Sequence, residues 1–259
     1  IVQPTCYPGN DNIMEMLIFI DAARRASAGR ITAVMPYFSY ARTDKKDQPR
    51  VPITARLVAD LVHTAGAERV VLMDLHAAQV QGFFTGVVDE LTAQPMLADY
   101  FLGKGLSNLV VVAPDIGSSR RSRDFAARVD APLAIIEKRR VGNDDRVETL
   151  NVIGNVHGKA ALMFDDEINT GSTMVAASKI LADNGCQEVY ACATHGIMPG
   201  DAASKLVAVP NLKEIVITDT VPLDDNKKNP KITVLSIAPL LGEAIQRIHE
   251  GRSVGELFS

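Results

Sequence analysis

The sequence predicts an α/β fold with mainly parallel sheets that are covered by helices. Three observations lead to this class. The expected strands are apolar along their whole length, as is typical of strands buried on both faces. Helical segments separate many of these strands. Residues 65–76 and 184–195 share Gly, Val and His at matching places, which fits a duplicated unit, although a glycine that ends a helix before a strand is common in α/β proteins.

The elements follow one another in a regular alternation. The first helix is expected over residues 10–29, where Ile13, Leu17 and Ile20 repeat at helical spacing and a glycine closes the segment. A buried strand is expected directly afterwards. The full series is a strand at 30–38, a helix at 53–66, strands at 69–75, 108–114, 132–137 and 161–164, a helix at 173–185, strands at 188–194, 214–220 and 232–237, and a helix at 239–251.

Composition narrows the class of protein. The chain has 259 residues, of which 47% are hydrophobic, so it can bury the core of one large domain or two smaller ones. Its net charge is -4 with both signs interspersed, and it has no long apolar span, so neither nucleic acid nor a membrane is an expected partner. The three cysteines lack metal-binding spacing, which favours reduced thiols and a cytoplasmic protein. The sequence begins at Ile1 without a Met, and we expect a further amino-terminal segment.

Polar residues collect where the expected strands end. In a parallel sheet the ligand crevice lies beyond the carboxyl ends of the strands, where the amino termini of helices also point. Any one of these residues could equally cap a helix or complete a structural hydrogen bond. Their shared position favours a ligand site. They are Asp74, His76, Asp115, Lys138, Asp165, Asp166 and His195.

Residues 165–173 place two adjacent carboxylates before a turn of small polar residues that enters a helix. Backbone N–H groups and hydroxyls in such a turn can bind a phosphate, with help from the helix dipole. Asp165 and Asp166 can accept hydrogen bonds from two neighbouring hydroxyls, so a phosphorylated sugar fits both parts. An N-capping Asp on an ordinary turn would explain only one carboxylate. The GxxxxGK[ST] pattern of a Walker loop is absent.

Two charged segments, 40–50 and 137–146, allow two interpretations. Such segments are usually solvated loops. Alternatively, Arg42, Lys138 and Arg140 reach over a polyphosphate, because Arg and Lys around a transferring phosphoryl group are the expected electrostatic catalysts.

The chain resembles the ribose-phosphate pyrophosphokinases, also called phosphoribosyl pyrophosphate synthetases, along essentially its whole length. The motifs that carry the resemblance are "NDNIMEMLI", "PYFSYARTDKKD", "MDLHAAQVQGFF", "APDIGS", "EKRR", "DDEINTGST", "THGI" and "TDTVP". The resemblance implies two pseudo-symmetric phosphoribosyltransferase-like domains, each a mainly parallel sheet flanked by helices. We expect an N-terminal domain at 1–93, with 250–259 packing back on it, and a C-terminal domain at 94–249 that carries the sugar-phosphate turn.

The resemblance also implies the reaction. Members of the family transfer the β,γ-diphosphate of ATP to the anomeric hydroxyl of ribose 5-phosphate and release AMP, with Mg²⁺ required. ATP and ribose 5-phosphate are therefore the expected substrates and Mg²⁺ the expected cofactor. Phosphate or ADP are expected as regulators near 44–50 and 253–259, and a homo-oligomer, commonly a hexamer, is the expected assembly.

The resemblance assigns the sugar site residue by residue. It places Asp165 and Asp166 on the ribose hydroxyls and His195 near the ribose. Asn169 stands where many members of the family have Asp, so that position offers no carboxylate as a general base. The residues of the ribose-5-phosphate turn are Asn169, Thr170, Gly171, Ser172 and Thr173.

The metal and ATP positions follow from the same resemblance. His76 and Asp115 match positions that coordinate Mg²⁺. Arg42, Thr43 and His76 match the ATP site, and Thr43 replaces a frequent Gln there. Ser118 replaces one glycine of a Gly-Gly turn in the motif "DIGSS".

Lys138 and Arg140 match a mobile catalytic loop, where they would neutralise charge on the transferred group. Two alternatives stay open. A phosphoribosyltransferase shares the "DDEINTGST" type of turn, but "YARTDKKD" and "EKRR" favour the diphosphokinase. A catalytically silent regulatory subunit would have lost the catalytic loop or the metal residues, which are present here.

Overall fold

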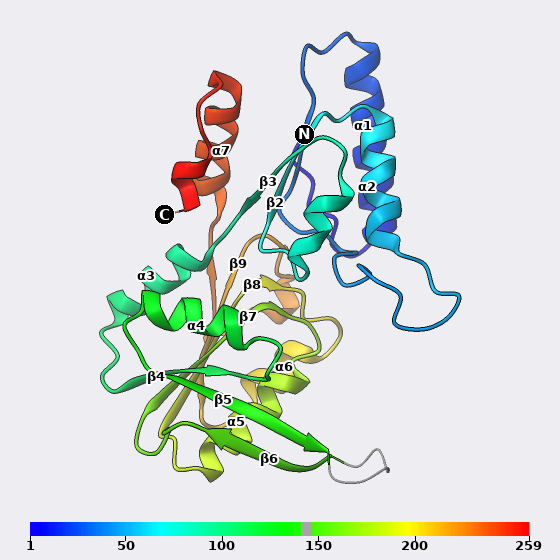
Figure 1. Cartoon of the computed structure of the whole chain (residues 1–259). Helices are drawn as coiled ribbons and strands as arrows, with labels where there is room; N and C mark the ends of the chain where they lie inside the picture. Colours follow the sequence, from blue (N-terminus) through cyan, green and yellow to red (C-terminus); the bar gives the residue numbers. More distant parts are fainter. Residues whose placement is uncertain (141–146, 259) are drawn as a thin grey trace. The chain divides into compact units, whose positions relative to one another are not determined.

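The computed structural model describes residues 1–140 and 147–258 (Figure 1). Contacts divide the chain into two compact units, each described here by itself. Unit 1 comprises Ile1–Ala93 and Ile237–Ser259, and unit 2 comprises Gln94–Ser236. The sequence analysis had placed the return of the chain to the first domain at residue 250, whereas the contacts place it at Ile237.

Unit 1 contains a parallel sheet of three strands in the order β1-β2-β3. Its elements, in chain order, are α1 (Gly9–Arg25), β1 (Thr32–Met35), α2 (Thr54–Ala65), β2 (Arg69–Met73), the 3-10 helix η1 (Ala78–Phe83), β3 (Val87–Leu91), α7 (Ala238–Glu250) and the 3-10 helix η3 (Gly255–Phe258).

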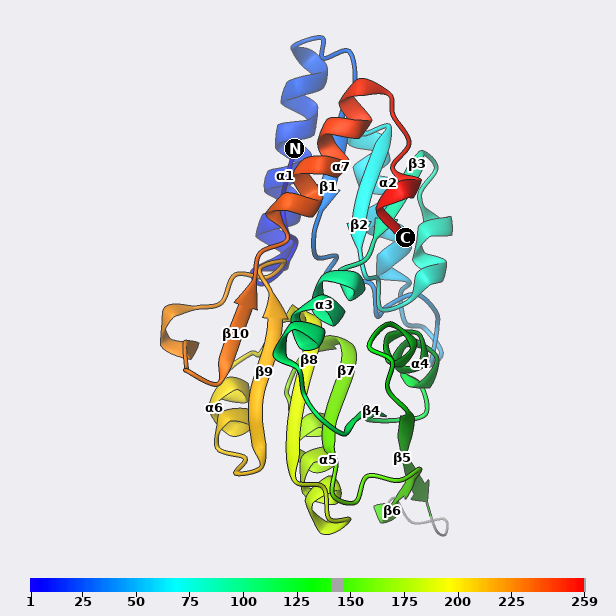
Figure 2. The same ribbon diagram turned by 90° about the vertical axis from the view of Figure 1, so that its left-hand side faces the viewer.

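Helices pack on both faces of this sheet. Side chains alternate along a strand, and Ala33 and Met35 of β1 join a buried core with Met16 of α1 and Val58 of α2. α7 packs on the opposite face of β1 (Figure 2), where its last carbonyl groups accept hydrogen bonds from Arg30. This packing explains why α7 belongs to unit 1.

Unit 2 contains a sheet of seven strands in the order β10-β9-β8-β7-β4-β5-β6, of which β6 alone among the described strands is antiparallel to its neighbour. Its elements, in chain order, are α3 (Gln94–Lys104), β4 (Leu109–Ala113), α4 (Ser119–Arg128), β5 (Leu133–Arg140), β6 (Val147–Ile153), β7 (Ala160–Ile168), α5 (Ser172–Asp183), β8 (Glu188–Gly196), α6 (Ala202–Val207), β9 (Leu212–Thr218), the 3-10 helix η2 (Asp225–Lys227) and β10 (Ile232–Leu235).

The two faces of the unit 2 sheet are covered by different helices. Ala161 and Met163 of β7 share a core cluster with Met174 of α5. Phe164 points to the other face and stacks on Phe125 of α4, with ring centres 4.2 Å apart. α5 and α6 therefore cover one face of the sheet, and α4 covers the other.

Several strands extend further than the sequence predicted. β7 continues to Ile168, β8 to Gly196 and β5 to Arg140, because neighbouring strands satisfy their backbone hydrogen bonds. The sequence analysis also named no elements at the positions of β3, α3, α4, β6 and α6.

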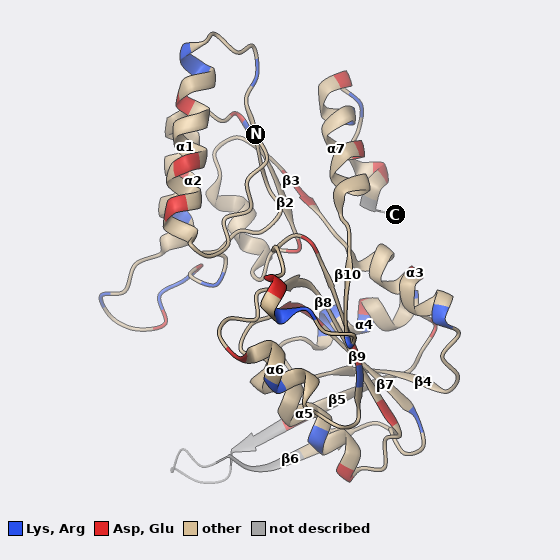
Figure 3. Cartoon of the chain, turned by 180° about the vertical axis from the view of Figure 1, so that it is seen from behind, with Lys and Arg blue, Asp and Glu red and all other residues tan. Residues whose placement is uncertain are grey.

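The surface and the cysteines agree with the composition. Basic and acidic residues are interspersed in both units (Figure 3). Cys6, Cys186 and Cys192 are all buried. Within the described residues, every helix is too short or too polar to cross a lipid bilayer.

Candidate active site

The strand order of unit 2 predicts that a ligand binds beside β4 and β7. The chain proceeds to β5 and β6 on one side of this pair and to β8, β9 and β10 on the other. Open α/β sheets bind ligands beyond the carboxyl ends of the strands at such a switch point. β4 and β7 are parallel, with Val112 opposite Met163. Asp115 follows Val112, and Asp165 and Asp166 follow Met163, so all three carboxylates lie at this edge.

The two adjacent carboxylates differ in exposure. The sequence analysis expected Asp165 and Asp166 just after the end of a strand. In the structure they lie inside β7, which continues to Ile168. The side chain of Asp166 is 2% exposed, and that of Asp165 is 21% exposed. By strand alternation Asp166 points to the face of Phe164, which α4 covers. Asp165 is therefore the more accessible of the two.

Arg121 of α4 joins the carboxylates. Its Nη1 atom lies 3.2 Å from Oδ1 of Asp165 and also donates to Oδ1 of Asp166. The backbone N–H of Asp166 donates to the same Asp165 oxygen at 2.9 Å. The sequence analysis did not single out Arg121, since it lies in a run of charged residues with no recognisable motif. The paired carboxylates themselves were a signal, because two adjacent acidic residues in a buried strand need a cationic partner, and Arg121 is such a residue.

The surroundings of Asp165 favour its protonated form. Burial is the largest cause, followed by the hydrogen bond and the charge of Asp166, and together they raise the pKa of Asp165 to about 8. The Asp166 N–H and the charge of Arg121 act in the opposite direction. Carboxyl groups perturbed in this way collect at functional sites.

The turn after β7 presents polar groups at the start of α5. Gly171 has a φ of 72°, and a Cβ atom there would lie 2.9 Å from Leu206 of α6, so the turn requires glycine. Thr170 and Ser172 are exposed, with their hydroxyl oxygens 2.9 Å apart. The structure shows no side-chain hydrogen bond capping this end of α5 among the described residues. Its first backbone N–H groups can therefore face an anion.

His195 is a buried residue inside β8, paired in register with Glu167 of β7. Its Nδ1 atom lies 2.8 Å from the hydroxyl oxygen of Thr220. The hydroxyls of Thr218 and Thr220 both donate to the carbonyl oxygen of Thr194. This network fixes the imidazole, and contact of His195 with a ribose stays a prediction.

Unit 1 has its own group of predicted residues. Arg42 and His76 are both exposed. The side chain of Gln79, at the start of η1 just after His76, donates a hydrogen bond to the Asp44 carboxylate. This bond ties the segment that carries Arg42 to the turn that carries His76.

Two polar residues of unit 1 have structural hydrogen bonds. The Thr43 hydroxyl donates to the carbonyl oxygen of Tyr40 at 2.8 Å and accepts the N–H of Ala55 at 3.1 Å, which ties this segment to the start of α2. Asp74 accepts the N–H of Ala93 at 2.8 Å. These hydrogen bonds give both residues a structural role, and ATP binding by Thr43 stays a prediction.

Lys138 and Arg140 lie in β5, where both pair with β6. The expectation of a loop over 137–146 is therefore wrong for residues 137–140, because β6 provides an antiparallel partner for them. Residues 141–146 of that segment lie outside the described residues. The structure gives the strand position of Lys138 and Arg140, and their catalytic role stays a prediction.

The described residues contain no group of three or more His, Cys, Asp or Glu that could hold a metal ion. His76 belongs to unit 1 and Asp115 to unit 2. Oδ1 of Asp115 accepts the N–H of Ser118 at 2.8 Å, which fixes this carboxylate at the start of α4. Mg²⁺ is usually held by one or two carboxylates together with waters and substrate phosphates. Asp115 therefore fits an ion that is held largely by a phosphorylated substrate.

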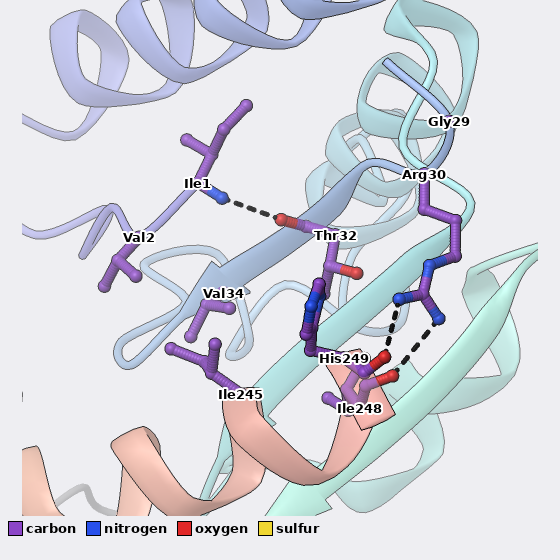
Figure 4. Close-up of a pocket in the computed structure, with 9 residues that line it drawn as sticks. All are labelled: Ile1, Val2, Gly29, Arg30, Thr32, Val34, Ile245, Ile248 and His249. Carbon is purple, nitrogen blue, oxygen red and sulfur yellow. Dashed lines mark hydrogen bonds between the residues drawn. The ribbon is translucent and has the colours of Figure 1, made fainter. Parts of the chain in front are cut away.

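A cavity of about 600 Å³ in unit 1 lies apart from all the predicted site residues (Figure 4). It is lined on one side by β1, including Val34, and on the other by Ile245 and Ile248 of α7. Arg30 at its rim donates to the carbonyl oxygens of Ile248 at 3.2 Å and His249 at 3.0 Å. Arg30 therefore caps the end of α7, and the predicted chemistry lies elsewhere.

Comparison with known proteins shows what the chain is similar to. The family description "N-terminal domain of ribose phosphate pyrophosphokinase" matches residues 1–66, and "Phosphoribosyl synthetase-associated domain" matches residues 144–259. A ribose-phosphate pyrophosphokinase of Caldanaerobacter subterraneus is 55% identical over 260 residues, which cover 100% of this chain and 82% of that protein. The chain belongs to the ribose-phosphate pyrophosphokinase family.

Other relatives agree. The ribose-phosphate pyrophosphokinase of Oceanobacillus iheyensis is 50% identical over 258 residues, which cover 100% of this chain and 81% of that protein. The crystal structure of phosphoribosylpyrophosphate synthetase from Mycobacterium smegmatis has a TM-score of 0.88 at 42% identity and covers 96% of this chain and 81% of that one. These relatives confirm the predicted α/β fold class and the prediction that the chain is a ribose-phosphate pyrophosphokinase.

Proposed function

We propose that the carboxyl edge of the unit 2 sheet is the ribose 5-phosphate site of this ribose-phosphate pyrophosphokinase. The sugar phosphate binds to the turn from Asn169 to Thr173 and to the first N–H groups of α5. The ribose hydroxyls bind to the carboxylates of β7. The observation that carries this proposal is the position of the Arg121-bound pair, Asp165 and Asp166, near the end of the strand that leads through the left-handed Gly171 into α5.

The nucleotide and the transfer involve further residues. In this proposal Arg42, Thr43 and His76 of unit 1 bind ATP, and Lys138 and Arg140 neutralise charge on the diphosphate as it is transferred. The family resemblance supports all five assignments. For the unit 1 residues there is also the hydrogen bond from Gln79 to Asp44, which links the segment of Arg42 and Thr43 to the turn of His76.

The family resemblance supports a Mg²⁺ ligand at His76 of unit 1 and another at Asp115 of unit 2, and Mg²⁺ takes further oxygen ligands from substrate phosphates. When bound, the ion supplies positive charge beside the phosphates. The protein residues position the sugar and exclude alternative orientations of its hydroxyls. Asn169 cannot take a proton from the sugar, so positioning and charge neutralisation carry the transfer, as is general for phosphoryl-type chemistry.

The setting of the enzyme is also a proposal. Three buried cysteines and the enzyme's family favour a cytoplasmic location. The family resemblance supports a homo-oligomer, in the family commonly a hexamer, and regulation by phosphate or ADP near 44–50 and 253–259.

Calorimetry with the full chain tests the sugar site. Asp165→Ala and Thr173→Val are expected to weaken ribose 5-phosphate binding by about 1–3 kcal/mol, since each leaves a polar partner unpaired. ATP affinity is expected to change little. Asp124→Asn, an exposed carboxylate on α4, is the matched control and should change neither. Loss of ATP binding with unchanged sugar binding would overturn the assignment.

A further inference from the structure

The contact between Arg121 and the carboxylate pair points to a role for each of the three residues. We propose that Arg121 is a positioning residue for sugar binding, which holds Asp166 in a buried ion pair and orients both carboxylates for the ribose hydroxyls, with Asp165 as the more accessible of the two. This inference rests on the proposed ribose 5-phosphate site and specifies how that site is organised.

The different burial of Asp165 and Asp166 supports different roles for the two carboxylates. Asp166 is 2% exposed and shares Nη1 of Arg121 with Asp165, which is 21% exposed. A carboxylate as buried as Asp166 needs a charge partner, because an isolated buried charge is strongly unfavourable. Arg121 supplies that partner, so the outer oxygen positions that a ligand can approach belong mainly to Asp165.

Three contacts hold Arg121 in place. Ser122 donates from its hydroxyl to the carbonyl oxygen of Phe164 at 3.3 Å, directly before the pair. Phe125 stacks on Phe164 with an angle of 3° between the rings. The start of α4 is fixed by the hydrogen bond from the Ser118 N–H to Asp115. α4 is thus attached to β7 just after the arginine and to the segment that follows β4 just before it, so the guanidinium is preorganised for the carboxylates.

Charge gives the inference a measurable consequence. Two adjacent carboxylates cannot both ionise easily, and the charge of Arg121 lowers the pKa of Asp165 against the effects of burial and of Asp166. Removing Arg121 should therefore raise the pKa of Asp165. Among the described residues, Asp166 on β7, Arg121 on α4 and Cys192 on β8 interact with Asp165. Strand pairing adds Glu167 two residues further along β7, His195 opposite Glu167 on β8, and Asp115 after β4, the neighbour of β7.

The test compares arginines of one helix. Arg121→Met keeps much of the side-chain volume and removes the charge, whereas Arg120→Met and Arg123→Met remove exposed charges from the same helix. Calorimetry with ribose 5-phosphate is expected to show a loss of roughly 10- to 100-fold for Arg121→Met, the scale of a hydrogen bond to a charged group. The two control variants should bind the sugar phosphate as the wild type does.

A pH series supplies the readout that a merely structural role would not move. An ionised carboxylate accepts hydrogen bonds from two hydroxyls, so wild-type affinity should rise as Asp165 ionises near pH 8. In Arg121→Met this rise should move to higher pH. Arg121→Lys keeps the positive charge, and its midpoint should stay near that of the wild type while its affinity lies between the other two. The phosphate of the ligand titrates identically in every variant.

The outcomes separate the inference from the proposed function. If Asp165→Ala leaves ribose 5-phosphate binding unchanged, the site itself is misassigned and the inference falls with it. If Asp165→Ala weakens binding but Arg121→Met matches its control variants, or shows an unshifted midpoint, the site stands and the role of Arg121 is refuted. Should Arg121→Met fail to fold, Arg121→Gln, which also removes the charge, takes its place, and wild-type sugar binding with an unshifted midpoint in that variant refutes the role equally.

Discussion

Asp165 reduces the stability of the folded chain near neutral pH. Burial and the neighbouring Asp166 raise the pKa of Asp165 to about 8 in the folded protein, whereas in an unfolded chain the pKa is the ordinary one of an aspartic acid, about 3.9. Between these values the folded state holds a proton that the unfolded state releases. The free energy of unfolding therefore falls as the pH rises through this window and levels off above it. A residue placed for ligand binding thus opposes folding.

Replacing Asp165 with Asn tests this cost. Asn cannot ionise, and its side-chain oxygen can still accept the Asp166 N–H and the Arg121 guanidinium. We expect Asp165→Asn to exceed the wild type in free energy of unfolding at about pH 8, with the advantage shrinking toward about pH 5. Urea unfolding at several pH values measures this. Asp124→Asn is the control, and a pH-independent difference for Asp165→Asn would contradict the assigned pKa.

The sequence could predict the carboxylate pair but not its arginine. Asp165 and Asp166 are adjacent, so their proximity is visible in the chain itself. Arg121 reaches them only because α4 packs on β7, a contact between segments far apart in the sequence. Exposure was equally hidden, because strand alternation decides which carboxylate lies under α4 only after the strand is known to continue through both.

At the scale of elements, apolar periodicity predicted the helices and strands that bury many apolar side chains. α4 gave no such signal, because Arg120, Arg121 and Arg123 dominate its first turns and its buried residues include a single large apolar side chain, Phe125. Strand ends were also misplaced. β5 appears to end at Glu137 when read by its apolar residues, but pairing with β6 extends it to Arg140. Hydrogen bonds to a neighbour, which the sequence does not show, set these limits.

The turn between β7 and α5 depends on one glycine. Gly171 and Gly158 have similar positive φ angles of 72° and 68°, but only Gly171 faces the side chain of Leu206, whereas a Cβ at Gly158 meets nothing within 4 Å. Alanine at Gly158 should therefore cost only the left-handed conformation, about 1 kcal/mol. Alanine at Gly171 should cost clearly more and should also weaken ribose 5-phosphate binding.

A double-mutant cycle separates the two contributions at Gly171. If the steric contact with Leu206 adds to the cost, Gly171→Ala combined with Leu206→Ala should destabilise the chain less than the sum of the single changes. Urea unfolding gives the three values. Equal costs for Gly171→Ala and Gly158→Ala, or full additivity in the cycle, would show that α6 does not constrain the turn.

At the scale of the whole molecule, the proposed ligand sites divide between the units. The sugar-phosphate residues all lie in unit 2, whereas Arg42, Thr43 and His76 lie in unit 1. The sequence shows a related repeat, because residues 65–76 and 184–195 each contain the end of a helix, a glycine and a strand that is followed or ended by a histidine. The structure places these segments at β2 in unit 1 and β8 in unit 2.

Hydrogen exchange measured by mass spectrometry tests this division on the intact chain. A ligand stabilises the state that it binds, by about 2.7 kcal/mol at a concentration of 100 Kd. Ribose 5-phosphate alone is therefore expected to slow exchange in peptides that cover the Asn169–Thr173 turn and the start of α5, while peptides from α1 and α2 keep their unliganded rates. Asp165→Ala, measured at the same ligand concentration, should lose most of this protection. Protection confined to unit 1, or undiminished in Asp165→Ala, would mean that the sugar phosphate binds elsewhere.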